Sequence, residues 1–373
     1  MMEKNNSILT KVFFICFFVS FVNFSAFSQT IPYQNDYALG LDLSFVKQSE
    51  DRGTKYYDED GTEKPVLQIF RQHGFNWSRI MICNEPTNRL PQDLEYVVEA
   101  ASAAKEYNYF FLLDMMFSNG WANPMNQPTP SLWVDMSHPE RVEAVYEYVH
   151  KVVSRLKSEG LTPDMIQIGN EIGNGFLWPD GRINYAKPEE SKWEHVADYL
   201  KAGVRAIRAL KDGKKIKIML HVDHGGDLEM TQTFFDNMNK YNVDYDVVGL
   251  SFYPWSHGTL IDLKDNLKMT ALRFKKEIIV VETGYYYSEG NYFKDQKPPF
   301  PETPEGQKAW FEAVNEAVLD TPNGLGRGVF WWHPLFRTRG FFDTETNVAK
   351  PIVGAVEKYG LPIKRADGQK RIQ

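Results

Sequence analysis

The feature that most constrains the fold is an eightfold alternation of short apolar runs with amphipathic stretches along residues 30–373. The apolar runs are continuous, which is typical of parallel strands that helices cover on both faces. Eight such alternations predict an α/β fold, a single (β/α)8 or TIM barrel. An open doubly wound sheet is the alternative, but no glycine-rich phosphate loop follows the first run. The predicted strands are Leu39–Phe45, Trp77–Ile82, Tyr109–Asp114, Met165–Gly169, Ile216–His221, Val247–Phe252, Ile278–Glu282 and Gly328–Trp332.

The amphipathic stretches have the apolar spacing of helices that pack one face against a sheet. No linker, low-complexity tract or charge block separates them, so residues 29–373 are predicted to form one domain. The predicted helices are Leu94–Tyr107, Arg141–Lys157, Trp193–Leu210, Leu228–Tyr241, Leu263–Lys275 and Glu305–Leu319.

Charge and aromatic content narrow the class of ligand. The net charge of −7 and the lack of a basic run argue against a nucleic-acid partner. The chain holds 9 Trp, 19 Tyr and 25 Phe, 14% of its residues. This excess fits either a stacking surface for sugar rings or a large core, and composition alone leaves both open.

The N-terminus has the pattern of an export signal. Lys4 and Lys11 precede an apolar run, Val12–Val22, that is too short for the roughly 20 residues of a membrane-spanning helix. Residues 1–28 are therefore predicted to be a secretory signal peptide that is cleaved before Gln29; an uncleaved membrane anchor is the alternative. Cleavage would remove Cys16 and leave Cys83 as the single cysteine. We expect an exported protein without an internal disulfide or a remaining membrane segment, in the periplasm, at the cell surface or in the medium.

Polar and aromatic residues gather at the predicted strand ends, where barrel enzymes place their sites. Two tryptophans, Trp121 and Trp178, lie in loops rich in Pro, Asn and Gly and are candidates for stacking on a sugar. The candidate residues at strand ends are Asp42, Arg79, Asp114, Asn170, Glu171, His221, Tyr253, Glu282 and Trp332.

Glu171 and Glu282 form a candidate catalytic pair. They end the fourth and seventh predicted strands, which face one another across a barrel. Retaining glycoside hydrolysis uses two carboxyl groups about 5–5.5 Å apart, one protonated and one ionised. Asn170 is suited to bind a sugar 2-hydroxyl, while Arg79 and Tyr253 could stabilise an ionised Glu282. A single strand-end Glu is more often a solvated or ion-paired residue, but an Asn-Glu and a Glu on these two strands favour catalysis.

The motifs resemble those of glycoside hydrolase family 53, retaining endo-β-1,4-galactanases built on (β/α)8 barrels. The similarity covers roughly Leu39–Leu335 and rests on several strings in order. The most specific are Gly169-Asn170-Glu171-Ile172, Leu177-Trp178-Pro179, Ser251-Phe252-Tyr253-Pro254, His257-Gly258-Thr259 and Val281-Glu282-Thr283. The resemblance implies that Glu171 is the acid/base, Glu282 the nucleophile and Trp332 the platform under the sugar, with Asn170, Arg79 and Tyr253 in support. It also implies a polysaccharide substrate, the β-1,4-galactan of pectic arabinogalactan.

The chain departs from the family pattern after the third strand and after the eighth. Met115–Asn119 replaces a Phe-His-Tyr-Ser-Asp string, Asn123 replaces an Asp, and His333 follows Trp332 where the family commonly has Glu. These positions are expected to line the region that holds the sugar. Loss of several polar partners with the carboxylates kept predicts hydrolysis with altered specificity. Two alternatives therefore stay open. The substrate could be another plant β-glycan or an arabinose-containing side chain, or the barrel could bind carbohydrate without cleaving it.

No catalytic metal or other cofactor is expected. His221-Val222-Asp223-His224 offers two histidines at a strand end, but their side chains diverge unless the chain turns at once. Asp58 and Asp60 before Gly61 resemble part of a calcium loop and lack its terminal Glu, so a solvated turn is predicted. The protein is expected to act as a monomer.

Overall fold

The computed structural model describes residues 37–86, 90–294 and 296–359, all within one compact unit, Tyr33–Gln373. Eight parallel strands close in sequence order into a barrel, with β8 paired to β1. The predicted TIM barrel is therefore confirmed. The strands are β1 (Ala38–Asp42), β2 (Trp77–Ile82), β3 (Phe110–Met115), β4 (Met165–Ile168), β5 (Lys217–Val222), β6 (Val247–Phe252), β7 (Glu277–Thr283) and β8 (Gly326–Trp331).

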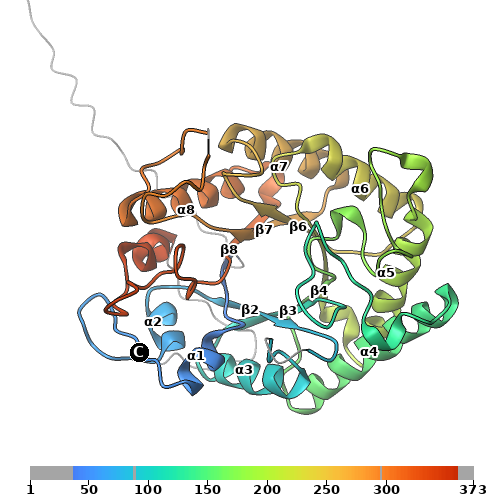
Figure 1. The fold of residues 1–373 in the computed structure, drawn as a ribbon, viewed down its shortest axis with the longest axis horizontal. Helices are drawn as coiled ribbons and strands as arrows, with labels where there is room; N and C mark the ends of the chain where they lie inside the picture. Colours follow the sequence, from blue (N-terminus) through green and yellow to red (C-terminus); the bar gives the residue numbers. More distant parts are fainter. Residues whose placement is uncertain (1–36, 87–89, 295, 360–373) are drawn as a thin grey trace, which may run out of the picture. The chain divides into compact units, whose positions relative to one another are not determined.

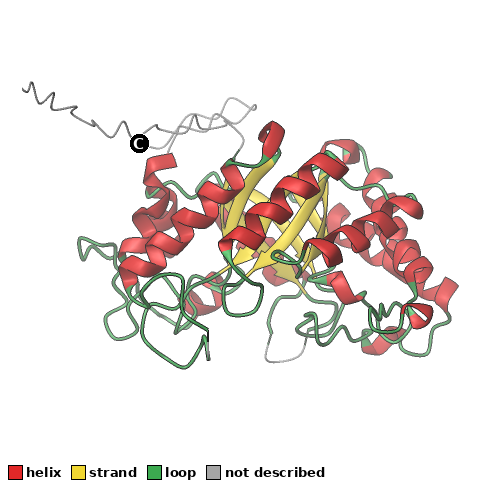
Figure 2. Ribbon diagram, turned by 90° about the horizontal axis from the view of Figure 1, so that it is seen from above, coloured by secondary structure: helices red, strands yellow, loops and turns green. Residues whose placement is uncertain are grey.

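Helices surround the ring of strands, as Figure 1 shows in a view along the barrel and Figure 2 from the side. All six predicted helices are present, and two short helices, α1 and α2, were not predicted. The α-helices are α1 (Val46–Asp51), α2 (Val66–Gln72), α3 (Leu94–Glu106), α4 (His138–Ser158), α5 (Trp193–Arg208), α6 (Leu228–Lys240), α7 (Leu260–Phe274) and α8 (Pro304–Leu319). Short 3₁₀ helices lie at Ser131–Trp133, Ile172–Asn174, Pro188–Glu190, Gly213–Lys215, Pro322–Gly324 and Pro351–Tyr359.

Several boundaries differ from the prediction. The first strand ends at Asp42 rather than Phe45, because the chain turns into α1 at Val46. Helix α4 begins at His138, three residues before the predicted start, because Ser137 and Glu140 form a capping box there. The apolar spacing starts only inside the helix, so it cannot locate a polar first turn.

Two apolar layers support the barrel. One fills the space between the strands and the surrounding helices, and the other fills the barrel interior. Packing is so close inside that a Cβ on Gly40 of β1 would lie 2.2 Å from Cδ1 of Phe330 on β8. The interior layer consists of Ala38, Leu112, Met165, Met219, Val247, Ile279, Val281 and Phe330.

The predicted signal peptide, residues 1–28, lies outside the described residues. Within the part of the chain that the structure describes, no helix combines the length and hydrophobicity needed to cross a membrane.

Candidate active site

A fully buried arginine organises the polar residues at the strand ends. The guanidinium of Arg79, on β2, lies 2.9 Å from Asp42 Oδ2, 2.8 Å from Asp114 Oδ2 and 2.8 Å from Glu282 Oε1. It also donates a hydrogen bond to Asn170 Oδ1 at 2.8 Å. One side chain therefore joins residues from β1, β3, β7 and the end of β4. We call these five residues, Asp42, Arg79, Asp114, Asn170 and Glu282, the Arg79 group.

The Arg79 group contains three carboxylates and one cation, so its charge is not balanced. Burial raises the pKa of Asp114 to about 7, although the adjacent Arg79 guanidinium lowers it. Asp114 also accepts a hydrogen bond from Gln167 at 2.6 Å. Asp42 and Asp114 are buried beneath the guanidinium, 3% and 0% exposed. Their contacts position Arg79 beside Glu282.

Glu282 is held so that its ionised form is favoured relative to that of Glu171. Burial raises the pKa of Glu282, but Arg79 opposes this, as does the hydrogen bond that Tyr253 Oη donates to Glu282 Oε2 at 2.9 Å. The pKa of Tyr253 itself is raised well above its usual value by burial, so the hydroxyl remains a neutral donor. A carboxylate that is held by a cation and a hydroxyl can act as a nucleophile.

Glu171 is in the opposite situation. Its pKa is raised well above its usual value, first by burial and then by the negative charges of Glu282 and Asp223. The Ser251 hydroxyl donates to Glu171 Oε1 at 2.7 Å and lowers the pKa only in part. Glu171 has a left-handed backbone, with φ 49° and ψ 50°, at the turn that leaves β4. A buried carboxylic acid that retains its proton can protonate a leaving group.

A second row of hydrogen bonds holds the Asn-Glu turn. His221 is fully buried on β5, and its Nε2 lies 2.8 Å from Ser251 Oγ, the same hydroxyl that contacts Glu171. Burial lowers the pKa of His221 well below its usual value, so the ring is neutral. Gln127 donates to the backbone oxygens of Asn170 and Glu171 at 2.7 and 3.2 Å. The structure thus places His221 behind Glu171, as a residue that positions it through Ser251.

The predicted tryptophans lie in two places. Trp121 and Trp332 are edge-to-face with ring centroids 6.1 Å apart, and Trp121 also contacts Phe45 at 5.8 Å. Trp121 is 39% exposed, so its ring can contact a ligand. Trp178 is half-buried; its ring is covered by Arg182 at 4.8 Å and its Nε1 donates to Asn174 O. The structure joins Trp121 with Trp332 and gives Trp178 a separate set of contacts.

The positions that depart from the family pattern have different surroundings. Met116 is buried in an apolar cluster with Met81, Cys83, Leu90 and Ala122, and His333 stacks on Phe45 at 4.5 Å. Burial lowers the pKa of His333 to about 4, so its ring is neutral.

The amides of the two substituted asparagines form hydrogen bonds with loop backbone, Asn119 with the loop after β2 and Asn123 within its own loop. Asn119 donates to the backbone oxygens of Asn84 and Glu85, and Asn123 accepts from the backbone of Met125. Whether these two positions line the region that holds the sugar stays a prediction.

The two sequence motifs that were considered as metal sites, at residues 221–224 and 58–61, form other contacts. His221 points into the barrel, while His224 lies against Gly173, so the two histidines of that motif do not share a site. Asp58 pairs with Lys64 at 2.6 Å and with His73 at 2.8 Å.

Sequence reasoning missed Ser251 and Gln127. Ser251 could have been found, because residues two apart on a strand share a face and Tyr253 had been selected. Gln127 lies in a loop whose path the sequence does not specify.

The fold and site define the class of (β/α)8 glycoside hydrolases, in which two acidic residues share one mouth of the barrel. The profile of glycosyl hydrolase family 53 matches residues 38–355, and the chain belongs to this family.

Relatives are similar over most of the chain. An uncharacterized protein encoded in the bgaB 5′ region of Niallia circulans is 37% identical, over 80% of this chain and 84% of that protein. The arabinogalactan endo-β-1,4-galactanase of Thermothelomyces thermophilus is 30% identical, over 80% of this chain and 89% of that enzyme. Among solved structures, the family 53 catalytic domain of Ignisphaera aggregans superposes with a TM-score of 0.79 at 28% identity, over 88% of this chain and 98% of that domain.

Proposed function

We propose that this glycoside hydrolase is a retaining, endo-acting enzyme that cleaves β-1,4-galactan or a related plant β-glycan. The observation that carries the proposal is that two buried carboxyl groups have different electrostatic surroundings. Among the described residues no cation forms an ion pair with Glu171, and its pKa is raised well above its usual value, whereas Glu282 is paired with Arg79 and accepts a hydrogen bond from Tyr253. Unequal environments of this kind assign the acid and nucleophile roles to the two groups.

The reaction follows from these roles. Glu282 attacks the anomeric carbon while Glu171 transfers its proton to the departing glycosidic oxygen, which breaks the bond and forms a glycosyl-enzyme ester. Glu171, now ionised, takes a proton from water, which attacks the same carbon and releases Glu282. Because the ester forms in the same step, Glu171 becomes ionised as Glu282 loses its charge, and the net charge of the pair does not change.

Galactan is the first substrate to test, because several relatives are named endo-β-1,4-galactanases. The apolar surroundings of Met116 and the neutral His333 favour a second candidate, a plant β-glycan with a different pattern of hydroxyls. A site that lacks a hydrogen-bonding partner for a hydroxyl no longer selects for that hydroxyl.

The experiment is release of reducing ends from a panel of galactan, arabinogalactan, mannan, xylan and arabinan. We expect galactan to be cleaved, with internal bonds cut first. Glu282→Ala should abolish turnover in a folded protein, and Glu171→Gln should slow substrates with poor leaving groups more than activated aryl glycosides. If the wild-type protein binds a polymer but does not hydrolyse it, the proposed enzymatic activity is rejected, and a carbohydrate-binding barrel is favoured.

Export is part of the proposal. Residues 1–28 have the charge and length of a signal peptide, which would deliver the enzyme to a polymer outside the cell. N-terminal sequencing of the exported protein should begin at Gln29, and a retained Met1 would show an anchor instead.

A further inference from the structure

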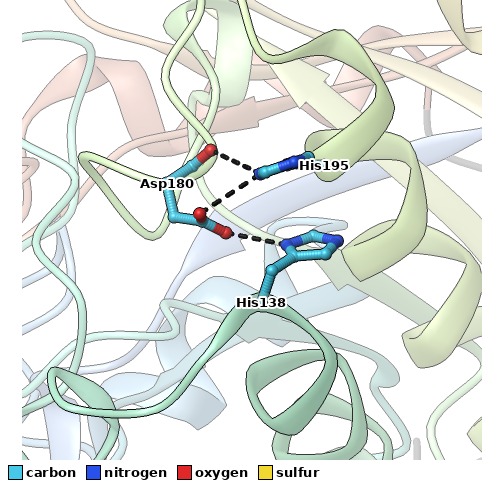
Figure 3. A group of neighbouring side chains, drawn as sticks. All are labelled: His138, Asp180 and His195. Atoms are coloured by element: carbon cyan, nitrogen blue, oxygen red, sulfur yellow. Dashed lines mark hydrogen bonds and ion pairs between the residues drawn. The ribbon is translucent and has the colours of Figure 1, made fainter.

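Three potential metal ligands converge on the loops that flank β4, outside the Arg79 group. His138 is the first residue of α4, Asp180 lies in the loop that follows β4, and His195 is in the first turn of α5. Figure 3 shows both imidazole rings beside the carboxylate of Asp180. Asp180 is 42 residues after His138 and 15 residues before His195, so no short sequence motif contains all three.

The distances suit a small cation. His138 Nδ1 lies 2.8 Å from Asp180 Oδ2, and His195 Nδ1 lies 3.2 Å from Asp180 Oδ1. One ligand atom from each residue can be chosen so that all lie within 4.8 Å of one another. Donors around a tetrahedral zinc ion, each about 2.0–2.1 Å from the metal, lie about 3.3 Å apart. A small outward movement of these side chains would meet that requirement.

The surroundings contain the outer partner that a metal-binding histidine needs. His138 Nε2 lies 3.3 Å from Asp198 Oδ2. A carboxylate at this nitrogen fixes the proton on Nε2 and leaves the Nδ1 lone pair free toward Asp180, as in carboxylate–histidine–zinc arrangements. Apart from the imidazoles, the cluster contains two aspartates, Asp180 and Asp198, and Arg141, whose Nη1 is 3.4 Å from Asp180 Oδ2, and these three side chains sum to a net charge of −1. This charge favours a cation.

A hydrogen-bond cluster without metal is the competing explanation. Asp180 accepts a short hydrogen bond from the Tyr199 hydroxyl, and both imidazoles can donate to it through Nδ1. The backbone oxygen of Asp180 is 3.1 Å from His195 Nδ1 and can accept from it too. The imidazole rings stack with centroids 3.8 Å apart. The explanations differ in one respect: only a metal site gives a saturable response to an added ion.

We propose that His138, Asp180 and His195 bind one divalent transition-metal ion, preferentially Zn²⁺, which clamps the loop after β4 to the starts of α4 and α5. Two imidazoles and a carboxylate are ligands that zinc accepts, and half-burial leaves a fourth position open to water. The same loop carries Trp178, two residues before Asp180. The ion would be structural and takes no part in hydrolysis.

The test uses the whole protein as it is exported, freed of bound metal with EDTA and dialysed, and zinc chloride is the probe. Isothermal titration should give one site per chain. With free zinc at about 100 times Kd, the melting temperature should rise by about 4 °C for a chain of this length. Calcium chloride should produce no comparable rise, because calcium prefers six to eight oxygen ligands.

Variants assign the site. His195→Ala and the near-isosteric Asp180→Asn should each abolish the zinc-induced rise, and the second keeps the proposal testable if the first does not fold. His150→Ala, on α4 beside Tyr146, is the matched control and should keep the full response. The proposal is overturned if the wild type shows no saturable zinc binding, if Asp180→Asn responds like the wild type, or if calcium acts and zinc does not.

Discussion

The hydroxyl of Tyr253 offers a sharp test of how Glu282, the proposed nucleophile, is kept ionised. Tyr253→Phe removes the 2.9 Å hydrogen bond to Glu282 Oε2 and retains the ring, which stacks on Trp255 with centroids 5.0 Å apart. Hydrogen bonds to charged groups contribute about 1.5–3 kcal/mol. One pKa unit corresponds to about 1.36 kcal/mol, so the pKa of Glu282 should rise by about one to two units.

The sign of the effect on activity follows directly. In the proposed mechanism Glu282 acts as its carboxylate, so activity should increase as pH rises through the pKa of Glu282, which would set the acid limb of the profile. Loss of a donor that favours the ionised form raises this pKa, and the acid limb should move to higher pH by about one to two units. The basic limb, which reports loss of the Glu171 proton, should move little.

The assay is kcat/KM on a soluble oligosaccharide or aryl glycoside from pH 3 to pH 9, because this ratio reports the groups of the free enzyme. Tyr148→Phe is the matched control: the Tyr148 hydroxyl is buried and finds no hydrogen-bond partner among the described residues. An acid limb that stays in place or moves to lower pH in folded Tyr253→Phe would refute the assigned role of this hydroxyl.

Three further predictions follow from the same contacts. Glu171→Gln should raise the melting temperature relative to wild type at pH 7–8 and lose this advantage near pH 4. Because the pKa of Glu171 is raised in the folded state, its ionisation above the usual 4.5 destabilises the fold, and Gln never ionises. Equal melting temperatures of the two proteins at both pH values would contradict this. Ser251→Ala removes a donor that lowers the pKa of Glu171, so the basic limb of kcat/KM should move to higher pH, by about one to two units for a hydrogen bond to a charged group worth about 1.5–3 kcal/mol. Gly40→Ala should lower the free energy of unfolding by about 1–3 kcal/mol in urea denaturation, because its Cβ would meet the Phe330 ring. Gly120→Ala, whose Cβ would lie 4.0 Å from Cδ1 of Leu90, should change this free energy little.

The barrel could be predicted from the sequence because its strands share one pattern of burial. Most strand residues are buried on both faces, so the strands read as largely apolar runs such as Val247–Phe252. Helices α1 and α2 contain six and seven residues, less than the two turns over which a helical period can be recognised. They were missed for that reason.

The candidate site divides in the same way. Glu171, Glu282 and Arg79 were found because a barrel brings every strand end to one mouth, whatever the separation in sequence. Gln127 and the cluster of His138, Asp180 and His195 depend on the paths of loops, which only side-chain contacts fix. Sequence reasoning could therefore identify most of the strand-end residues, Ser251 excepted, but not the contacts that loops bring to Gln127 or to the three-residue cluster.

The contact between Phe45 and His333 spans the seam at which the barrel closes. Phe45 follows the first strand and His333 follows the last, and these strands are paired through Leu41 and Trp331. The surface beside Trp332 is thus made jointly by the earliest and latest parts of the barrel to leave the ribosome. A nascent chain that has folded seven strands still lacks this surface, so catalytic competence arrives together with completion of the fold.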